Sequence, residues 1–210
     1  MTGDAIPADN SIPEDDKSGK VDVDFEYVKA AKEGDVHAFD QLVIKYSPKL
    51  YGLIYHMTSH AEDSRDLLQD VFAKAFRSLP KFQGKSAFYT WIYSISVNMT
   101  LNYLKKKKRR GGFSYDPMDE AVLNSETFVD GSHHSNPRKQ TGINELQKKL
   151  NIAMQALSND HRAVVTMFDI QGMRHGEIAE ILGISEGTVR SRLFYAHQQM
   201  RVHLGEFMDG

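Results

Sequence analysis

The chain has 210 residues, a formal net charge of -2 and no cysteine. This length allows one domain or two small ones, and the missing cysteine excludes disulfides, thiolate zinc sites and a cysteine nucleophile from this sequence. No apolar run approaches the ~20 residues that cross a bilayer, and the start lacks the basic-then-apolar plan of a signal peptide. We therefore expect a cytoplasmic protein with no membrane insertion.

The N-terminal segment over 1–22 is rich in Asp, Pro, Ser and Gly and has few large apolar side chains. Burial cannot offset the entropy that such a segment loses on ordering. We predict a disordered acidic tail there. The charge is segregated along the chain, because Lys105 to Arg110 form an uninterrupted cationic block.

Apolar residues at helical spacing over 23–110 predict a helical bundle. Gly34 ends a first helix, and the second carries a wide apolar stripe that Pro48 interrupts and is expected to kink. A third helix begins near Ala61 and stops at Pro80. Its residues expected to point inward are Leu67, Leu68, Val71, Phe72, Ala75, Phe76 and Leu79.

The stretch from Phe82 to Arg110 places aromatic, amide and cationic side chains on one segment, with Ser86 as the expected cap of a helix to about Leu104. An apolar face enters the core, and a polar face carries Asn98, Asn102, Lys105 and Lys106. Amides read bases, aromatic rings stack on unpaired bases at ~1–3 kcal/mol each, and cations attract the phosphate backbone. This combination predicts a surface for single-stranded nucleic acid. A core helix followed by a solvated lysine run is the alternative.

Residues 111–142 show no sustained period after Gly111-Gly112, and predict a flexible acidic linker. Asp130, His133 and His134 are the metal-ligand candidates in it. They have no supporting ligands, so we expect neither a metal nor another cofactor.

The second domain, over 143–207, begins with a helix defined by Leu146, Leu150, Ile152, Ala153 and Leu157. A helix capped by Ser158 and then a helix-turn-helix pattern follow. Ala179 is small where two helices approach, Gly183 suits a positive φ in the turn, and Ser185 caps the following helix. Near its start that helix presents the candidate contacts to duplex DNA, which are Thr188, Arg190, Ser191, Arg192 and Tyr195. An ordinary helical hairpin with surface arginines is the alternative.

The expected fold class is therefore all-α, with two small helical domains joined by a flexible linker, the C-terminal one a helix-turn-helix. These patterns are compatible with a free-standing helix-turn-helix regulator whose N-terminal bundle dimerises or senses. A nucleic-acid enzyme lacks support, because no stretch supplies a Walker loop, clustered metal ligands or a nucleophile with its base. We expect no catalysis and no small-molecule substrate.

Two sets of motifs in tandem resemble the extracytoplasmic-function (ECF, group 4) sigma factors, the dissociable promoter-recognition subunits of bacterial RNA polymerase. The resemblance covers most of 23–110 and 143–204. The residues that carry it are Gly34, Asp35, Ala38, Phe39, the run Asp66 to Phe72, Phe82, Gly84, Phe88, Thr90, Trp91, Ile92, Asn98, Asn102, Tyr103, Leu104, Glu177, Ile178, Ala179, Gly183 and the run Gly187 to Leu193.

The resemblance implies core polymerase and promoter DNA as partners, and an anti-sigma factor as a further one. The first domain would bind the polymerase clamp and the -10 element, the second would read the -35 duplex, and the acidic linker would run near the RNA exit path. The implied clamp-facing residues are Asp66, Gln69, Asp70 and Phe72. The implied site for a flipped -10 base is the loop Gln83, Gly84, Lys85, Ser86 and Ala87, with Asn98 and Asn102 beside it. The chain departs from the family's pattern at Tyr195, His197 and Gln198, where further basic residues are common, so the -35 preference is not carried over.

Overall fold

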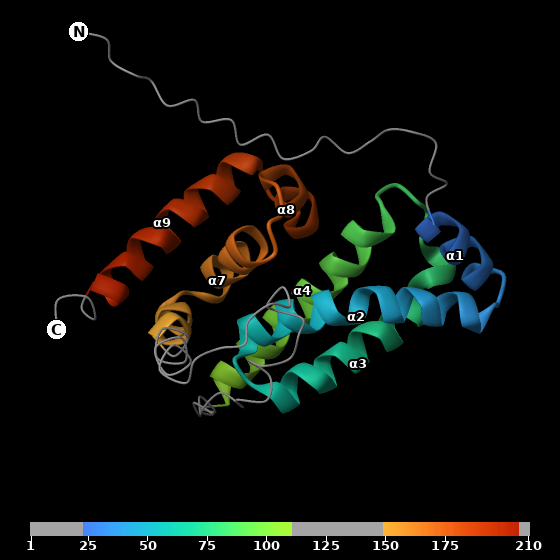
Figure 1. Cartoon of the computed structure of the whole chain (residues 1–210), viewed down its shortest axis with the longest axis horizontal. Helices are drawn as coiled ribbons and strands as arrows, with labels where there is room; N and C mark the ends of the chain where they lie inside the picture. Colours follow the sequence, from blue (N-terminus) through green and yellow to red (C-terminus); the bar gives the residue numbers. More distant parts are fainter. Residues whose placement is uncertain (1–22, 111–148, 206–210) are drawn as a thin grey trace, which may run out of the picture.

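The computed structural model describes residues 23–110 and 149–205, and the regular structure in these two ranges is entirely helical (Figure 1). The expected tail, the expected linker and the metal-ligand candidates Asp130, His133 and His134 lie outside the described residues. The elements are α1 (Val23–Lys32), α2 (Val36–Thr58), α3 (Ala61–Ser78), the short 3-10 helix η1 (Leu79–Lys81), α4 (Phe88–Arg109), a helix over 149–156, α7 (Asn159–Val165), the π-helical turn η2 (Thr166–Ile170), α8 (His175–Leu182) and α9 (Glu186–Gly205).

Local capping chemistry sets the ends of α2. Asp35 Oδ1 accepts hydrogen bonds from the backbone N–H of His37 at 2.9 Å and of Ala38 at 3.3 Å, as expected of an N-cap. At the other end Ser59 has a left-handed φ of 54° and its N–H returns to the carbonyl of Tyr55. The helix continues through Pro48 without a break, since it is one element of 23 residues.

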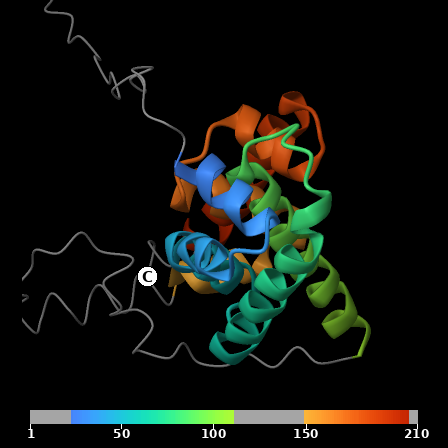
Figure 2. The ribbon, with the colours of Figure 1, turned by 90° about the vertical axis from the view of Figure 1, so that its right-hand side faces the viewer.

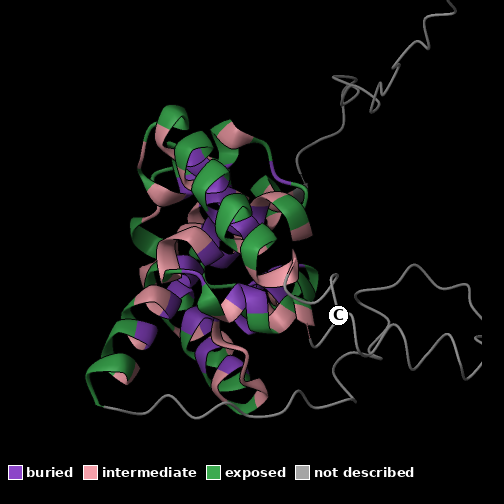
Figure 3. Ribbon diagram, turned by 90° about the vertical axis from the view of Figure 1, so that its left-hand side faces the viewer, coloured by how far each residue is buried: buried purple, intermediate pink, exposed green. Residues whose placement is uncertain are grey.

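The core of the first half lies between α2, α3 and α4, with α1 against α2. Figure 3 shows buried residues gathered on the inward sides of the helices and exposed ones on their outer sides. Most residues predicted to point inward from α3 are buried there, and Phe72 packs edge-on against Phe39 with ring centroids 6.5 Å apart. Leu68 is only partly buried, and Phe76 is 46% exposed although its ring centroid lies 5.0 Å from that of Phe39. The inward placement of Phe76 was therefore wrong: it lies at the edge of the stripe.

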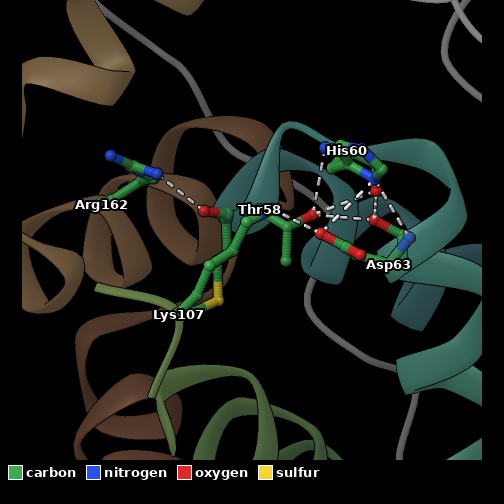
Figure 4. A network of polar contacts seen from close by, with 7 residues as sticks. Thr58, His60, Asp63, Lys107 and Arg162 are labelled. Carbon is green, nitrogen blue, oxygen red and sulfur yellow. Dashed lines mark hydrogen bonds and ion pairs between the residues drawn. The ribbon is translucent and has the colours of Figure 1, made fainter. Parts of the chain in front are cut away.

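A polar network ties the end of α4 to the start of α3 (Figure 4). Lys107 Nζ donates to Asp63 Oδ2 at 2.7 Å, and the imidazole of His60 caps α3 by accepting from the N–H of Asp63. Burial alone would raise the pKa of Asp63, but hydrogen bonds from Lys107 and Tyr103 and the nearby cations bring it below its usual value. The carboxylate is thus held ionised, and the register of α4 against α3 is fixed.

The second half begins with a helix over 149–156, and Leu146 lies outside the described residues. The positions that the helix buries differ in part from those predicted. Ala153 and Leu157 are buried as expected, whereas Leu150 and Ile152 are 39% and 44% exposed. The next cap is as predicted, because Ser158 Oγ accepts from the N–H of His161 at 3.2 Å.

The helix-turn-helix is formed by α8 and α9 as predicted from the sequence. Gly183 has a φ of 65° in the turn, and Ser185 Oγ accepts from the N–H of Thr188 at 3.1 Å to begin α9. Ala179 is buried where the two helices meet, together with Ile178 and Val189. These contacts orient the outer face of α9 away from its own core.

The two halves pack against each other. Helix α8 lies along α4, and both α7 and η2 contact α2 (Figures 1 and 2). The residues buried at this seam belong to one continuous apolar cluster with the cores of both halves.

Candidate nucleic-acid interface

The loop between η1 and α4 is exposed and anchored from α1. Gly84 has a φ of 68°, a conformation that side chains other than glycine rarely adopt. Lys32 Nζ donates to the carbonyl oxygen of Phe82 at 2.8 Å and so holds the loop against α1. The predicted cap was wrong: Ala87 is the N-cap of α4 without a side-chain hydrogen bond, and Ser86 Oγ donates to the carbonyl of Ala87 at 3.3 Å. No side chain satisfies the first amides of α4, which leaves partial positive charge beside the loop.

A cavity of about 390 Å³ lies between this loop and α1. Its lining combines apolar, cationic and amide groups from Phe25, Val28, Lys29, Lys32, Glu33, Phe82, Gln83 and Gly84. Behind the loop the ring of Phe82 stacks obliquely on Trp91 with centroids 4.9 Å apart, which gives the cavity a firm aromatic wall. Its volume falls at the lower end of the range of about 300–1,000 Å³ found for small-molecule pockets, and the aromatic ring of Phe82 offers a surface on which a base can stack.

The polar face of α4 is exposed as predicted at Asn98, Asn102, Lys105 and Lys106. It does not lie beside the loop. Asn98 and Asn102 are ten and fourteen residues beyond Phe88, the first residue of α4. At 1.5 Å per residue these asparagines stand about 15 and 21 Å along the helix axis. The loop and the asparagines therefore form two separate parts of one surface, and the expectation of a single pocket is corrected.

The far end of that face borders a second cavity, of about 1150 Å³, at the seam between the halves. One side of this cavity is lined by residues from the end of α4: Asn102, Lys105, Lys106, Lys108 and Arg109. The other side is formed by 155–160, Arg162 and Gln199. None of the four cations from the end of α4 is paired with a carboxylate in the described part of the chain, so this end carries a concentrated positive potential.

The acidic row on α3 is exposed at Asp66, Gln69 and Asp70, which follow one another at steps of three and one residues on one side of the helix. Phe72, assigned by the resemblance to the same surface, is only 8% exposed and packs on Phe39. It is a core residue, because its Cβ points away from the Asp66 side. That assignment of Phe72 is corrected.

The candidate contacts on α9 fall on two flanks of the helix. Four of them lie on one side of α9, spaced by three, one and three residues: Thr188, Ser191, Arg192 and Tyr195. Arg190 is two residues from Arg192, which places the two side chains about 200° apart around the helix axis. Arg190 instead pairs with Glu186 at 3.0 Å, and Arg192 contacts Asp160 at 3.5 Å.

Sequence reasoning missed two residues that position this surface. Lys32 holds the loop, and Arg162 is 2% exposed and bonded to four backbone carbonyls. Arg162 directly precedes the apolar residues Ala163 to Val165 of α7, and this position was the available signal for its burial. In the described ranges no group of three or more His, Cys, Asp or Glu side chains is placed to hold a metal ion. No helix of the described part is long and apolar enough to span a membrane.

Comparison with known proteins gives matches along both halves. The family model "Sigma-70 region 2" matches residues 42–110, and "Sigma-70, region 4" matches residues 149–200. The chain is 34% identical over 179 residues to the RNA polymerase sigma-H factor of Pseudomonas aeruginosa, covering 83% of this chain and 90% of that protein. It is 35% identical over 178 residues to the ECF RNA polymerase sigma-E factor of Haemophilus influenzae, covering 82% and 90%.

A similar fold is found in the co-crystal structure of the sigma factor RpoE with the anti-sigma factor NepR from Bartonella quintana. The TM-score is 0.56 at 21% sequence identity, with 81% of this chain and 98% of that chain covered.

Proposed function

Because this chain belongs to the ECF group of RNA polymerase sigma factors, we propose that it carries core polymerase to promoters by reading a -10 element with its first half and a -35 element with its second. The observation that carries this proposal is the tandem of two separate nucleic-acid surfaces, the loop and α4 face in one half and the outer side of α9 in the other. If the chain were a free-standing regulator, the surface formed by the loop and the α4 face would have no function.

The loop captures one flipped base of the non-template strand. The cavity between the loop and α1 offers an aromatic wall from Phe82 and polar partners from Gln83 and Lys29. Unstacking a base costs a few kcal/mol, which stacking and hydrogen bonds in the cavity offset. From there the strand follows the polar face of α4, where Asn98 and Asn102 contact bases or phosphates and the cationic end attracts the backbone.

The exposed row of Asp66, Gln69 and Asp70 binds core polymerase. None of these three residues lines the cavity beside the loop, so polymerase and the flipped base use different residues of the first half. In the second half Thr188, Ser191, Arg192 and Tyr195 enter the major groove at the -35 element, and Arg190 reaches a phosphate from the other flank of α9. The domains run over 23–110 and 143–207. The protein acts in the cytoplasm with the polymerase, has no catalysis of its own, and is a target for an anti-sigma factor.

The Asn98→Ala variant tests the role of the α4 face. We expect strand opening at the -10 element to fall about tenfold, because one lost contact to a base costs about 1–3 kcal/mol. Opening is measured by permanganate reactivity of unpaired thymines in the complex of polymerase, chain and promoter. Binding of the variant to core polymerase is expected to be unchanged.

The matched control is Gln41→Ala, an exposed amide on α2 outside both surfaces, which leaves opening unaltered. If Asn98→Ala lost polymerase binding and strand opening to the same extent, the assignment of this face to DNA would be refuted.

A further inference from the structure

Helix α1 lies beside the loop that joins η1 to α4, and it precedes the matched region 2, which begins at residue 42 (Figure 1). Polar contacts fix the position of α1 at both ends. Near its start the carboxylate of Asp24 accepts hydrogen bonds from Lys45 Nζ at 2.6 Å and from the hydroxyl of Tyr46. At its last residue Lys32 Nζ donates to the carbonyl oxygen of Phe82 at 2.8 Å. Helix α1 is therefore a fixed wall of the cavity beside the loop.

One side of this wall combines an aromatic ring with two cations. Phe25, Lys29 and Lys32 follow at steps of four and three residues, so they share one side of α1. All three line the cavity of about 390 Å³, and all three are exposed. Phe25 is 62% exposed, which leaves the face of its ring open to a ligand.

The two lysines of this side differ in what they contact. The ammonium of Lys32 is engaged with the loop, whereas no carboxylate in the described residues forms an ion pair with Lys29. Glu33 is the acidic residue of the lining, so two lysines against one glutamate leave the cavity with a net positive charge. An ammonium has three N–H donors, which is more than one base needs. Lys29 can therefore bind a phosphate as well.

The flipped base does not use the ring of Phe25. In the proposed function that base stacks on Phe82, which belongs to the loop side of the cavity, whereas Phe25 belongs to the α1 side. The nucleotide next to the flipped one is covalently linked to it and must lie at the rim of the cavity. Its base has lost a stacking neighbour, and an exposed aromatic ring restores stacking for any base.

We propose that α1 forms a second nucleotide subsite, in which Phe25 stacks on the base next to the flipped one and Lys29 contacts the phosphate that links the two nucleotides. This inference rests on the proposed function, in which the loop captures a base of the unpaired strand. Stacking of this kind tolerates every base, so the subsite adds affinity for the opened strand and little sequence preference.

Binding of the full chain with core polymerase to a fork-junction template tests the subsite. The template is duplex through the -35 element, and its non-template strand continues unpaired through the -10 element. We expect Phe25→Ala to weaken binding about tenfold and Phe25→Tyr to restore it, because a phenol ring also stacks on a base. Lys29→Gln should lower the slope of log affinity against log salt concentration by about 1.

An abasic site, moved one position at a time along the unpaired strand, identifies the nucleotide that Phe25 contacts. When the base that stacks on Phe25 is missing, Phe25→Ala should cause no further loss, because the contact is already absent. With the abasic site elsewhere, the loss of about tenfold should remain. General damage to α1 would instead weaken binding to every template by the same factor.

The matched control is Ile44→Ala, because Ile44 is 67% exposed on α2 and does not line the cavity. It should bind every template as the parent does. The subsite is overturned if Phe25→Ala binds all templates like the parent, weakens on all of them equally, or loses affinity for core polymerase without DNA. If the unaltered chain gave polymerase no affinity for the template, the proposed function would fail instead, so the two failures are distinguishable.

Discussion

Replacing Arg162 by Met is expected to lower the free energy of unfolding by about 3–5 kcal/mol, because the buried carbonyl oxygens that it satisfies lose their donor. Arg162 is 2% exposed, and its guanidinium donates to four backbone carbonyl oxygens. Nε donates to Met154 at 2.8 Å and Nη1 to Met57 at 2.7 Å. Nη2 donates to Gln155 at 2.8 Å and to Leu157 at 3.4 Å. One side chain thus satisfies the carboxyl ends of two helices, α2 and the helix over 149–156.

The partners explain why a hydrophobic replacement does not compensate. A buried ion pair is often exchanged for apolar side chains without loss, since both charges disappear together. Here the acceptors are backbone carbonyls that remain, and each buried acceptor left without a donor costs about 1–3 kcal/mol. Burial lowers the pKa of Arg162 to about 10, so it is still protonated at neutral pH. The helix-end carbonyls stabilise its charge in place of a carboxylate.

Urea unfolding followed by circular dichroism at pH 7 measures this difference. Arg201→Met, at an exposed position of α9, is the control and should change stability by no more than about 0.5 kcal/mol. The free energy of unfolding of Arg162→Lys should lie between those of Arg162→Met and Arg201→Met. An ammonium keeps the charge but cannot direct donors to four separate carbonyls. A loss below about 1 kcal/mol in Arg162→Met would show that the helix ends do not depend on it.

Arg192→Glu is expected to give the largest functional effect, a loss of more than tenfold in transcription from a promoter that depends on its -35 element. The substitution removes a contact worth about 1–3 kcal/mol and places a negative charge against the phosphates. Arg192 now contacts Asp160 at 3.5 Å, a long and partly exposed pair that costs little to break. Asp160→Asn should therefore leave transcription unchanged or raise it.

The comparison is made by single-round transcription on two templates, one with the -35 element and one with that element scrambled. Arg192→Glu should lower transcription from the first template to the level seen with the second, and should leave transcription from the second template unchanged. Equal activity of variant and parent on the first template would remove Arg192 from the -35 surface. An equal loss on both templates would point to a fault in folding or polymerase binding.

Local chemistry made much of the fold predictable. The caps at Asp35, Ser158 and Ser185 and the turn at Gly183 depend on residues a few positions away, so the sequence contains the whole cause of each. Helical spacing likewise identified most of the core. It failed at the margins of stripes, as at Phe76 and Ile152, because the extent of a buried face is decided by the neighbouring helix.

The candidate site was predictable by residue type more than by arrangement. The exposed amides of α4 and the outer side of α9 were identified, but the loop and the asparagines, which stand about 15 and 21 Å along the axis of α4 from its first residue, were expected to form one pocket. Arg162 could not be understood from sequence, since its partner Met57 is 105 positions away and offers a backbone atom that any residue would supply. The contribution of α1 to the loop cavity depends on long-range packing in the same way.

Run-off transcription with purified bacterial core polymerase on a pooled promoter library, with and without the chain, is the direct test of sigma-factor activity. We expect transcripts that require the chain and whose promoters share paired elements near -10 and -35. This expectation would be contradicted by a library that gives no chain-dependent transcripts while the chain alone binds duplex DNA tightly, which is the behaviour of a free-standing regulator.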